Sequence, residues 1–167
     1  MIKAFIFSLA LLLPIGNEIS SYVCDEYKAY ACEIAEMYDL SPELIVAMIE
    51  KESSGKRKAV SSANCIGLMQ ISPKWQKDRM EKLGVTDLTD AYSNILVGCD
   101  LVAELFDKYG DVYAVLMAYN EGEYSGAIER AENGEYSAYA TKIVERWREM
   151  QFDGRKDVSE LLHIQKP

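Results

Sequence analysis

The chain is poor in histidine and has no metal-ligand spacing. Of its 167 residues, only His163 is a histidine, and it lies close to the C-terminal end. One histidine in a tail leaves little room for a histidine-based metal site, and it makes a Ser-His catalytic triad implausible. The four cysteines, at positions 24, 32, 65 and 99, are not spaced like zinc ligands. We therefore expect no metal and no other cofactor.

The chain also lacks an apolar run long enough to cross a bilayer. Residues 1–3 carry one lysine, and residues 4–13 are an apolar stretch too short to span a membrane by itself. This layout predicts a signal peptide over residues 1–20 and hence an exported protein, periplasmic or extracellular. No Ala-x-Ala site is present, and Ile19-Ser20-Ser21 is only a tolerable small-residue site for cleavage after Ser20. An uncleaved N-terminal anchor, which would tether the protein to a membrane, is the alternative.

Positive charge is in deficit. The chain has 18 lysines and arginines against 27 aspartates and glutamates, a net charge of −9. An acidic surface argues against nucleic acid as a partner and against tight retention on anionic polymers. The length suits one domain with a substantial core, which we expect to be a monomer.

Alternating strand patterns, internal repeats and low-complexity tracts are absent, whereas helical periodicity is found almost throughout. It predicts an all-α domain over residues 21–150, followed by a polar tail over residues 151–167. The expected helices cover residues 24–38, 41–51, 73–83, 92–109, 112–119, 125–132 and 137–150.

One carboxylic acid falls on the apolar side of its predicted helix. Ser41-Pro42-Glu43 is a typical helix start, with a serine cap and proline in the first turn. At about 100° per residue, Glu52 lies in the middle of the arc formed by Leu44, Met48 and the two isoleucines, whereas Glu50 points the other way. Burial and the negative end of the helix dipole should both raise the pKa of Glu52. A carboxyl group kept protonated in this way can serve as a general acid. The alternative is a glutamate that reaches solvent at a frayed helix end.

Several short motifs follow one another in order. They are Glu52-Ser53, Ala59-Val60-Ser61, Gly67-Leu68-Met69-Gln70-Ile71-Ser72-Pro73, Asn94-Ile95 with Gly98, Ala118-Tyr119-Asn120-Glu121-Gly122, and Tyr139 ahead of Lys142-Ile143-Val144. Over about residues 30–150 the chain resembles the soluble lytic transglycosylase family. The resemblance implies a lysozyme-like fold with helices around a glycan-binding cleft, and cleavage of the glycan strands of peptidoglycan. A minor β-hairpin near residues 53–64 is an option in such folds, which would make the class α+β.

The segment from Ser53 to Ile66, which follows the acid, contains no aspartate or glutamate. Ordinary glycosidases need two carboxylates, and goose-type lysozymes, the hydrolytic relatives, carry acidic residues in this stretch. The resemblance implies instead a route with one carboxylate. Glu52 acts first as acid and then as base, and the C6 hydroxyl of N-acetylmuramic acid (MurNAc) closes a 1,6-anhydro ring after the bond to N-acetylglucosamine (GlcNAc) breaks.

Two alternatives are kept. One is a goose-type-lysozyme-like muramidase, a hydrolase whose second carboxylate would be Asp87, Asp90 or Glu121. The other is a catalytically silent glycan-binding or envelope-assembly protein on the same fold. Wall remodelling, a secretion or conjugation apparatus, and a phage-encoded role all fit an exported enzyme of this kind.

The resemblance also assigns supporting residues. Ser61 would hydrogen-bond the acid or the acetamido group of the substrate, and Met69 and Gln70 would line the cleft. Tyr119 and Asn120 would hold the N-acetyl group. Tyr139 would reach the catalytic carboxyl group. By pattern alone, Met69 and Tyr119 are equally good core residues, and residues 120–122 are equally good as the end of a helix.

The cysteines of an exported protein can form disulfides, and four cysteines allow three pairings. A Cys65–Cys99 bridge would fix the loop before the Gly67 turn, and would leave Cys24–Cys32 as a local bridge. Free buried thiols are the alternative. The basic run at residues 56–58 would contact carboxylates of the peptide stem or lie in a solvated loop.

Overall fold

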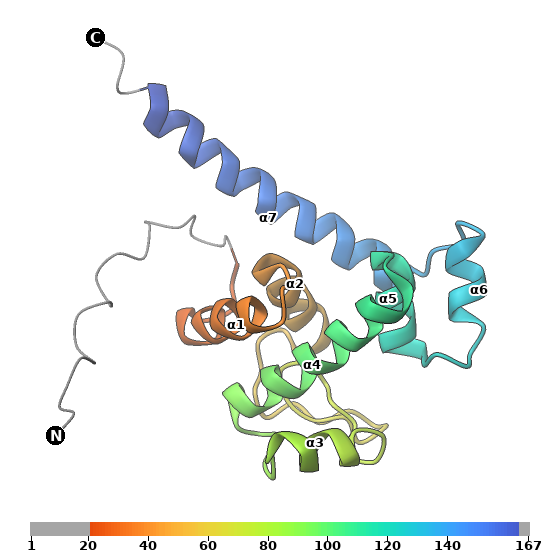
Figure 1. Ribbon diagram of the computed structural model, residues 1–167. Coiled ribbons are helices and arrows are strands. Elements are labelled where there is room, and N and C mark those ends of the chain that lie inside the picture. Colours follow the sequence, from red (N-terminus) through yellow and green to blue (C-terminus); the bar gives the residue numbers. More distant parts are fainter. Residues whose placement is uncertain (1–20, 164–167) are drawn as a thin grey trace, which may run out of the picture.

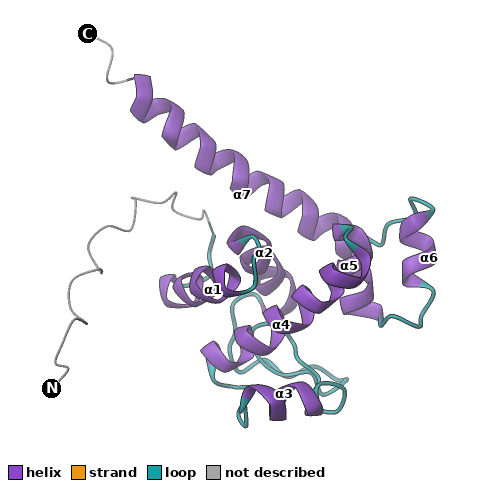
Figure 2. Cartoon of the chain, viewed as in Figure 1, coloured by secondary structure: helices purple, strands orange, loops and turns teal. Residues whose placement is uncertain are grey.

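The computed structural model describes the backbone of residues 21–163 and the side chains of residues 21–151. The predicted signal peptide or anchor, at residues 1–20, lies outside this range. The described chain folds into helices joined by loops, and between residues 21 and 163 no β-strand longer than an isolated bridge occurs (Figures 1 and 2). The helices are α1 Asp25–Met37, α2 Pro42–Ser53, α3 Lys77–Leu83, α4 Ala91–Tyr109, α5 Val112–Glu121, α6 Ala127–Glu132 and α7 Ala138–His163. The all-α prediction is confirmed.

Helix boundaries follow local capping chemistry. The Ser41 hydroxyl accepts a hydrogen bond from the Leu44 amide at 3.3 Å, with proline in the first turn of α2. Asp90 caps α4 through the amide of Ser93 at 2.9 Å, and Asp111 caps α5. Gly110 ends α4 at φ +67°, a conformation that glycine adopts without strain.

Helix α2 lies at the centre of the domain. It packs against α1 and α7, while α4 contacts α1, α3 and α5 (Figure 1). Every residue of α2 from Leu44 to Glu50 is buried. The helix is therefore enclosed on more sides than a simple amphipathic helix, for which one face would stay in water.

Four predicted boundaries ahead of α7 were wrong by two or more residues. Helix α2 ends at Ser53, two residues past Lys51. Helix α3 begins at Lys77, because residues 73–76 form a turn closed by a hydrogen bond from the Gln76 amide to the Ser72 carbonyl at 2.9 Å. Helix α5 runs two residues past Tyr119. Helix α6 begins at Ala127, because Gly126 occupies the cap position at φ +79°.

The predicted polar tail is also different in the structure. Helix α7 does not stop at Met150 but continues to His163 (Figure 1). Gly154 lies within this helix, and a glycine inside a helix costs only about 1 kcal/mol and does not force an end.

The segment between α2 and α3 is the main irregular region of the described chain, shown as loop in Figure 2. It contains two isolated antiparallel bridges, between Val60 and Ile66 and between Ile66 and Ile71. The optional hairpin near residues 53–64 is thus reduced to single bridges, the second of which closes the Gly67 turn.

Candidate active site

Glu52 lies in the last turn of α2, and Tyr139 of α7 donates a hydrogen bond from its hydroxyl to the Glu52 carboxyl group. The contact that the family resemblance predicted is therefore present. Burial raises the pKa of Glu52 above its ordinary value of 4.5, and this effect exceeds the opposing ones of the Tyr139 hydrogen bond and the Lys51 ammonium. The direction is that required of a group held protonated as a general acid.

Tyr119 of α5 is affected by the charge of the same carboxyl group. Its pKa is raised well above the ordinary value, first by burial and next by the charge of Glu52. Its hydroxyl donates to the Met69 carbonyl at 2.7 Å. The pKa of Tyr139 is raised for the same two reasons. Neither phenol can ionise readily, so both act as hydrogen-bond donors.

The turn at Gly67–Gln70 is held by Asn94 of α4. The Asn94 side chain accepts from the Met69 amide at 2.8 Å and donates to the carbonyls of Ile66 and Leu88, each at 2.9 Å. Gly67 has φ +84°, and a Cβ atom there would lie 2.2 Å from the Asn94 amide nitrogen. In the sequence, Asn94 is recognisable only as part of the Asn94-Ile95 motif. In the structure its side chain is completely buried, and its three hydrogen bonds position the turn.

Met69 does not line the cleft as predicted. Its side chain is fully buried and packs against Gly98, where an added Cβ would come within 2.3 Å of the Met69 sulfur. The core alternative is the one that the structure supports, and the close approach of α4 explains the glycine.

Gln70 does line the cleft. Its side-chain amide donates to the Gly67 carbonyl at 3.0 Å and to the Ala59 carbonyl at 3.3 Å, and its backbone has φ +50°. Ser61 bonds within its own loop: its hydroxyl accepts from the Cys65 amide at 3.0 Å. Ser61 therefore shapes the wall formed by residues 61–65, and its hydrogen bond to the acid or to the acetamido group stays a prediction.

A cleft of about 640 Å³ lies beside these residues. Its volume falls within the usual range for ligand sites. Its lining comes from the loop and turn before α3, from α4, and from the end of α5 with the loop after it. The lining residues are Ala63, Cys65, Gln70, Ile71, Ser72, Trp75, Gln76, Leu101, Leu105, Ala118, Tyr119, Asn120, Glu121, Gly122, Glu123, Tyr124 and Ser125. Glu52 is not among them, and Tyr119 is the lining residue that its charge affects.

The three residues named as second carboxylates have other partners. Asp87 accepts from the amide and hydroxyl of Thr89, which lowers its pKa, and Asp90 caps α4. Glu121 does line the cleft, and it forms an ion pair with Arg130 of α6. Glu123 is a further acid in the lining, and no pattern in the sequence indicated it.

All four cysteines are free thiols in the structure, so neither predicted disulfide is formed in it. Cys99 is buried, which raises the pKa of its thiol to about 12, and Cys24 is exposed. Cys65 lines the cleft. Both Cys65 and Cys99 affect the pKa of Tyr119. The two pairings remain predictions.

No group of three or more histidine, cysteine, aspartate or glutamate side chains within residues 21–151 could hold a metal ion. The basic run at residues 56–58 is exposed, and Arg57 donates to the Thr89 carbonyl at 3.1 Å. No helix in the described part of the chain is both long enough and apolar enough to cross a membrane.

Known proteins are similar to this chain in fold or in sequence. Lytic transglycosylase Slt from Pseudomonas aeruginosa, solved as an inactive mutant, superposes with a TM-score of 0.59 at 20% identity. The match covers 77% of this chain and 24% of that one. At this identity the likeness shows the fold.

Three relatives are similar in sequence. A transglycosylase of Enterobacteria phage PRD1 is 40% identical over 85 residues, which are 51% of this chain and 31% of the phage protein. Membrane-bound lytic murein transglycosylase C of Actinobacillus pleuropneumoniae is 34% identical over 62% of this chain and 32% of its own length. The invasion protein IagB of Salmonella typhimurium is 26% identical and is covered over 81% of its length. This chain therefore spans about a third of the two transglycosylases but most of the invasion protein.

The Transglycosylase SLT domain matches residues 29–143, more than half of the chain and a range that includes Glu52, the Gly67 turn, Tyr119 and Tyr139. On this match, this chain belongs to the Transglycosylase SLT domain family.

Proposed function

We propose that this protein is a peptidoglycan lytic transglycosylase that cleaves the β-1,4 bond between MurNAc and GlcNAc and leaves a 1,6-anhydro-MurNAc end. The observation that carries the proposal is the state of Glu52. It is a carboxyl group with a raised pKa, hydrogen-bonded by Tyr139 and close to a cleft lined by Tyr119.

In the first step, the protonated Glu52 carboxyl group donates its proton to the glycosidic oxygen as the bond to the MurNAc C1 breaks. The N-acetyl oxygen of the same sugar stabilises the positive charge that develops at C1. Tyr119 and Asn120 lie in the cleft lining, and they are the residues that we assign to hold that acetamido group. Their assignment rests on this position and on the family resemblance.

In the second step, the Glu52 carboxylate accepts the proton of the MurNAc C6 hydroxyl, whose oxygen bonds to C1. The proton lost in the first step is thereby recovered, and no water is consumed. An internal hydroxyl has a high effective concentration, so no second carboxylate is needed to activate a nucleophile. This fits a cleft whose lining carboxylates, Glu121 and Glu123, are both in ion pairs.

Mass spectrometry of fragments from purified peptidoglycan tests the proposal directly. We expect muramic ends that are lighter by one water than hydrolytic ends and that borohydride does not reduce. A digest dominated by reducing muramic ends would contradict the lyase route, and Glu121 would then be the second carboxylate to replace. Bound but uncleaved glycan would indicate the silent binding protein.

We further propose that the protein acts in the cell envelope after export, with peptidoglycan strands as its partner. The envelope and phage transglycosylases among its relatives support this location. Cell fractionation would test it, and N-terminal sequencing of the exported protein would show whether residues 1–20 are removed.

A further inference from the structure

Two aromatic side chains in the cleft lining are exposed to solvent. Trp75, in the turn before α3, has 75% of its surface exposed, and Tyr124, in the loop after α5, is fully exposed. Exposed apolar surface in a cleft commonly marks a ligand-binding site, because a protein gains nothing by leaving such side chains in water. The mechanism proposed above uses neither residue.

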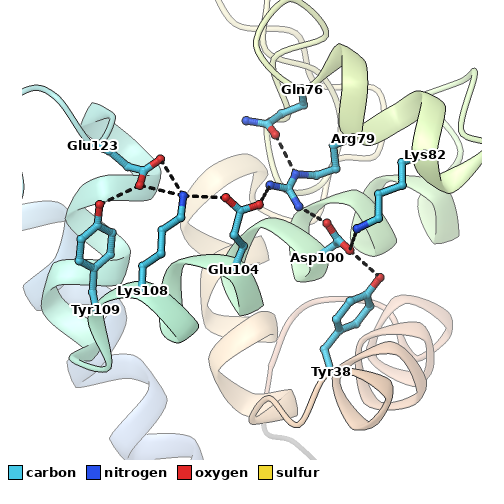
Figure 3. Close-up of polar contacts among 9 residues, drawn as sticks. All are labelled: Tyr38, Gln76, Arg79, Lys82, Asp100, Glu104, Lys108, Tyr109 and Glu123. Carbon is cyan, nitrogen blue, oxygen red and sulfur yellow. Dashed lines mark hydrogen bonds and ion pairs between the residues drawn. The ribbon is translucent and has the colours of Figure 1, made fainter.

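A ladder of ion pairs along α4 connects the neighbours of these two aromatics (Figure 3). The Gln76 side chain accepts from the Arg79 guanidinium at 2.9 Å, and Arg79 pairs with Glu104. Lys108 then pairs with Glu104 at 2.7 Å and with Glu123 at 3.1 Å. Figure 3 shows Gln76 and Glu123 at opposite ends of this chain of contacts.

Two further groups support the ladder. Tyr109 donates to Glu123 at 2.7 Å, and Asp100 pairs with Arg79 while accepting from Tyr38 at 3.2 Å (Figure 3). Asp100 is buried, so this end of the ladder is shielded from water. Because Gln76 follows Trp75 and Glu123 precedes Tyr124, the ladder links the neighbours of both aromatics to α4.

We propose that Trp75 and Tyr124 are sugar-stacking residues that hold the glycan strand in the cleft away from the bond being cleaved. The proposal rests on the glycan as substrate, as given under the proposed function. One face of a pyranose ring presents mainly C–H bonds, which pack against the flat apolar face of an indole or phenol ring. The ladder joins the segments that carry the two rings to the same helix, α4.

The charge of the cleft fits a neutral sugar. Its two lining glutamates are paired, Glu121 with Arg130 and Glu123 with Lys108 and Tyr109. The cleft therefore offers aromatic faces and amide groups rather than a free negative charge, although the protein as a whole is strongly acidic.

Tryptophan fluorescence tests the proposal without any cleavage. The chain has two tryptophans, and Trp147 packs against the core and donates to the Ser41 hydroxyl at 2.8 Å. Titration with GlcNAc tetramers and hexamers should give a saturable change in emission. That change should disappear in W75F, which retains an aromatic ring and only Trp147 as fluorophore.

Binding measured by calorimetry supplies the second readout. W75A and Y124A should each weaken binding of the hexamer by about tenfold, as loss of a stacking ring does elsewhere, while Y124F stays near wild type. M37A is the matched control, since Met37 at the end of α1 is 64% exposed and lies outside the cleft lining. Circular dichroism confirms that each variant is folded.

Hexamer affinities of W75A and Y124A within twofold of wild type would overturn the proposal, as would an unchanged fluorescence signal in W75F. GlcNAc oligomers contain no MurNAc, so this result is independent of the lyase chemistry. Reducing muramic ends in the digest would refute the proposed function alone. Anhydro ends together with a silent Trp75 would refute this inference alone.

Discussion

Glu50 and Glu52 are two residues apart on α2, and they face opposite sides of it. Glu50 is buried, and its carboxylate accepts from Arg146 of α7 at 2.7 and 3.2 Å and from the Ser21 hydroxyl at 2.5 Å. Glu52 has no such ion pair with the side chains of residues 21–151, and a phenol is its hydrogen-bond partner. The phenol leaves most of the desolvation of Glu52 uncompensated, and the pKa of Glu52 is therefore raised.

Helical periodicity alone places Glu50 outside the apolar arc of α2, yet the residue is buried. The structure covers that face with α7 and with residues 21–23. The face opposite the acid thus holds α2 against α7, the same helix that brings Tyr139 to Glu52.

The largest expected effect is that of E52Q on activity. If Glu52 is both acid and base, this replacement should lower turnover on purified peptidoglycan by about 10³-fold or more, because no other group in the site can transfer both protons. Turbidity clearing and released muropeptides measure it. Activity within tenfold of wild type would remove Glu52 from the role and dissolve the contrast with Glu50.

The next effect is that of Y139F. Loss of the hydrogen bond to Glu52 should lower turnover by about 10- to 100-fold. That bond lowers the pKa of Glu52, so its removal should raise this pKa further. The acid must be protonated, so activity falls as pH rises through this pKa, and the alkaline limb of the pH profile should move to higher pH. A limb that stays in place or moves to lower pH would contradict the assignment.

E50Q should act on stability rather than on chemistry. Removing one charge of a largely buried pair should cost about 1–3 kcal/mol in the free energy of unfolding, below the full cost of a buried pair because Arg146 is 30% exposed. Urea unfolding measures the loss, and turnover per folded molecule should change much less than in E52Q. R146M, and the double variant with E50Q, complete a mutant cycle. A stability equal to wild type would show that the Glu50–Arg146 pair does not stabilise the fold.

The smallest effect is the pH-dependent stability of E52Q. The pKa of Glu52 is raised in the folded protein, so its stabilising contribution is present below its ordinary pKa of 4.5 and is lost as pH rises through the folded pKa. A glutamine cannot ionise. E52Q should therefore have a higher Tm than wild type at pH 8, and this difference should vanish below pH 4.5. Thermal scans at the two pH values measure it, with E50Q expected to be less stable than wild type at pH 8.

Much of the fold could be predicted because its signals are local. Ser41-Pro42, Asp90 and Asp111 begin helices through bonds to amides two or three residues away, and Gly110 ends one through its own backbone freedom. The boundaries that were wrong depend on competition between local options, such as the turn at residues 73–76 or the continuation of α7 past Gly154.

The candidate site divides in the same way. Periodicity alone selected Glu52, because an acid in an apolar arc is a local anomaly. Tyr139 lies 87 positions along the chain from Glu52 and was found only through the family resemblance. Met69 was misplaced because a pattern does not show that α4 leaves room for its side chain at Gly98.

The sequence by itself determined where α2, α4 and α5 begin, that one glutamate would meet an apolar surface, and that the segment after it would carry no second acid. Only the tertiary structure decided which partner each carboxyl group received. Arg146 and Tyr139 lie on the same helix, and the way α7 packs along α2 gives the guanidinium to Glu50 and the phenol to Glu52. A carboxyl group's pKa depends on charges and donors within a few ångströms, and those neighbours come from distant parts of the chain.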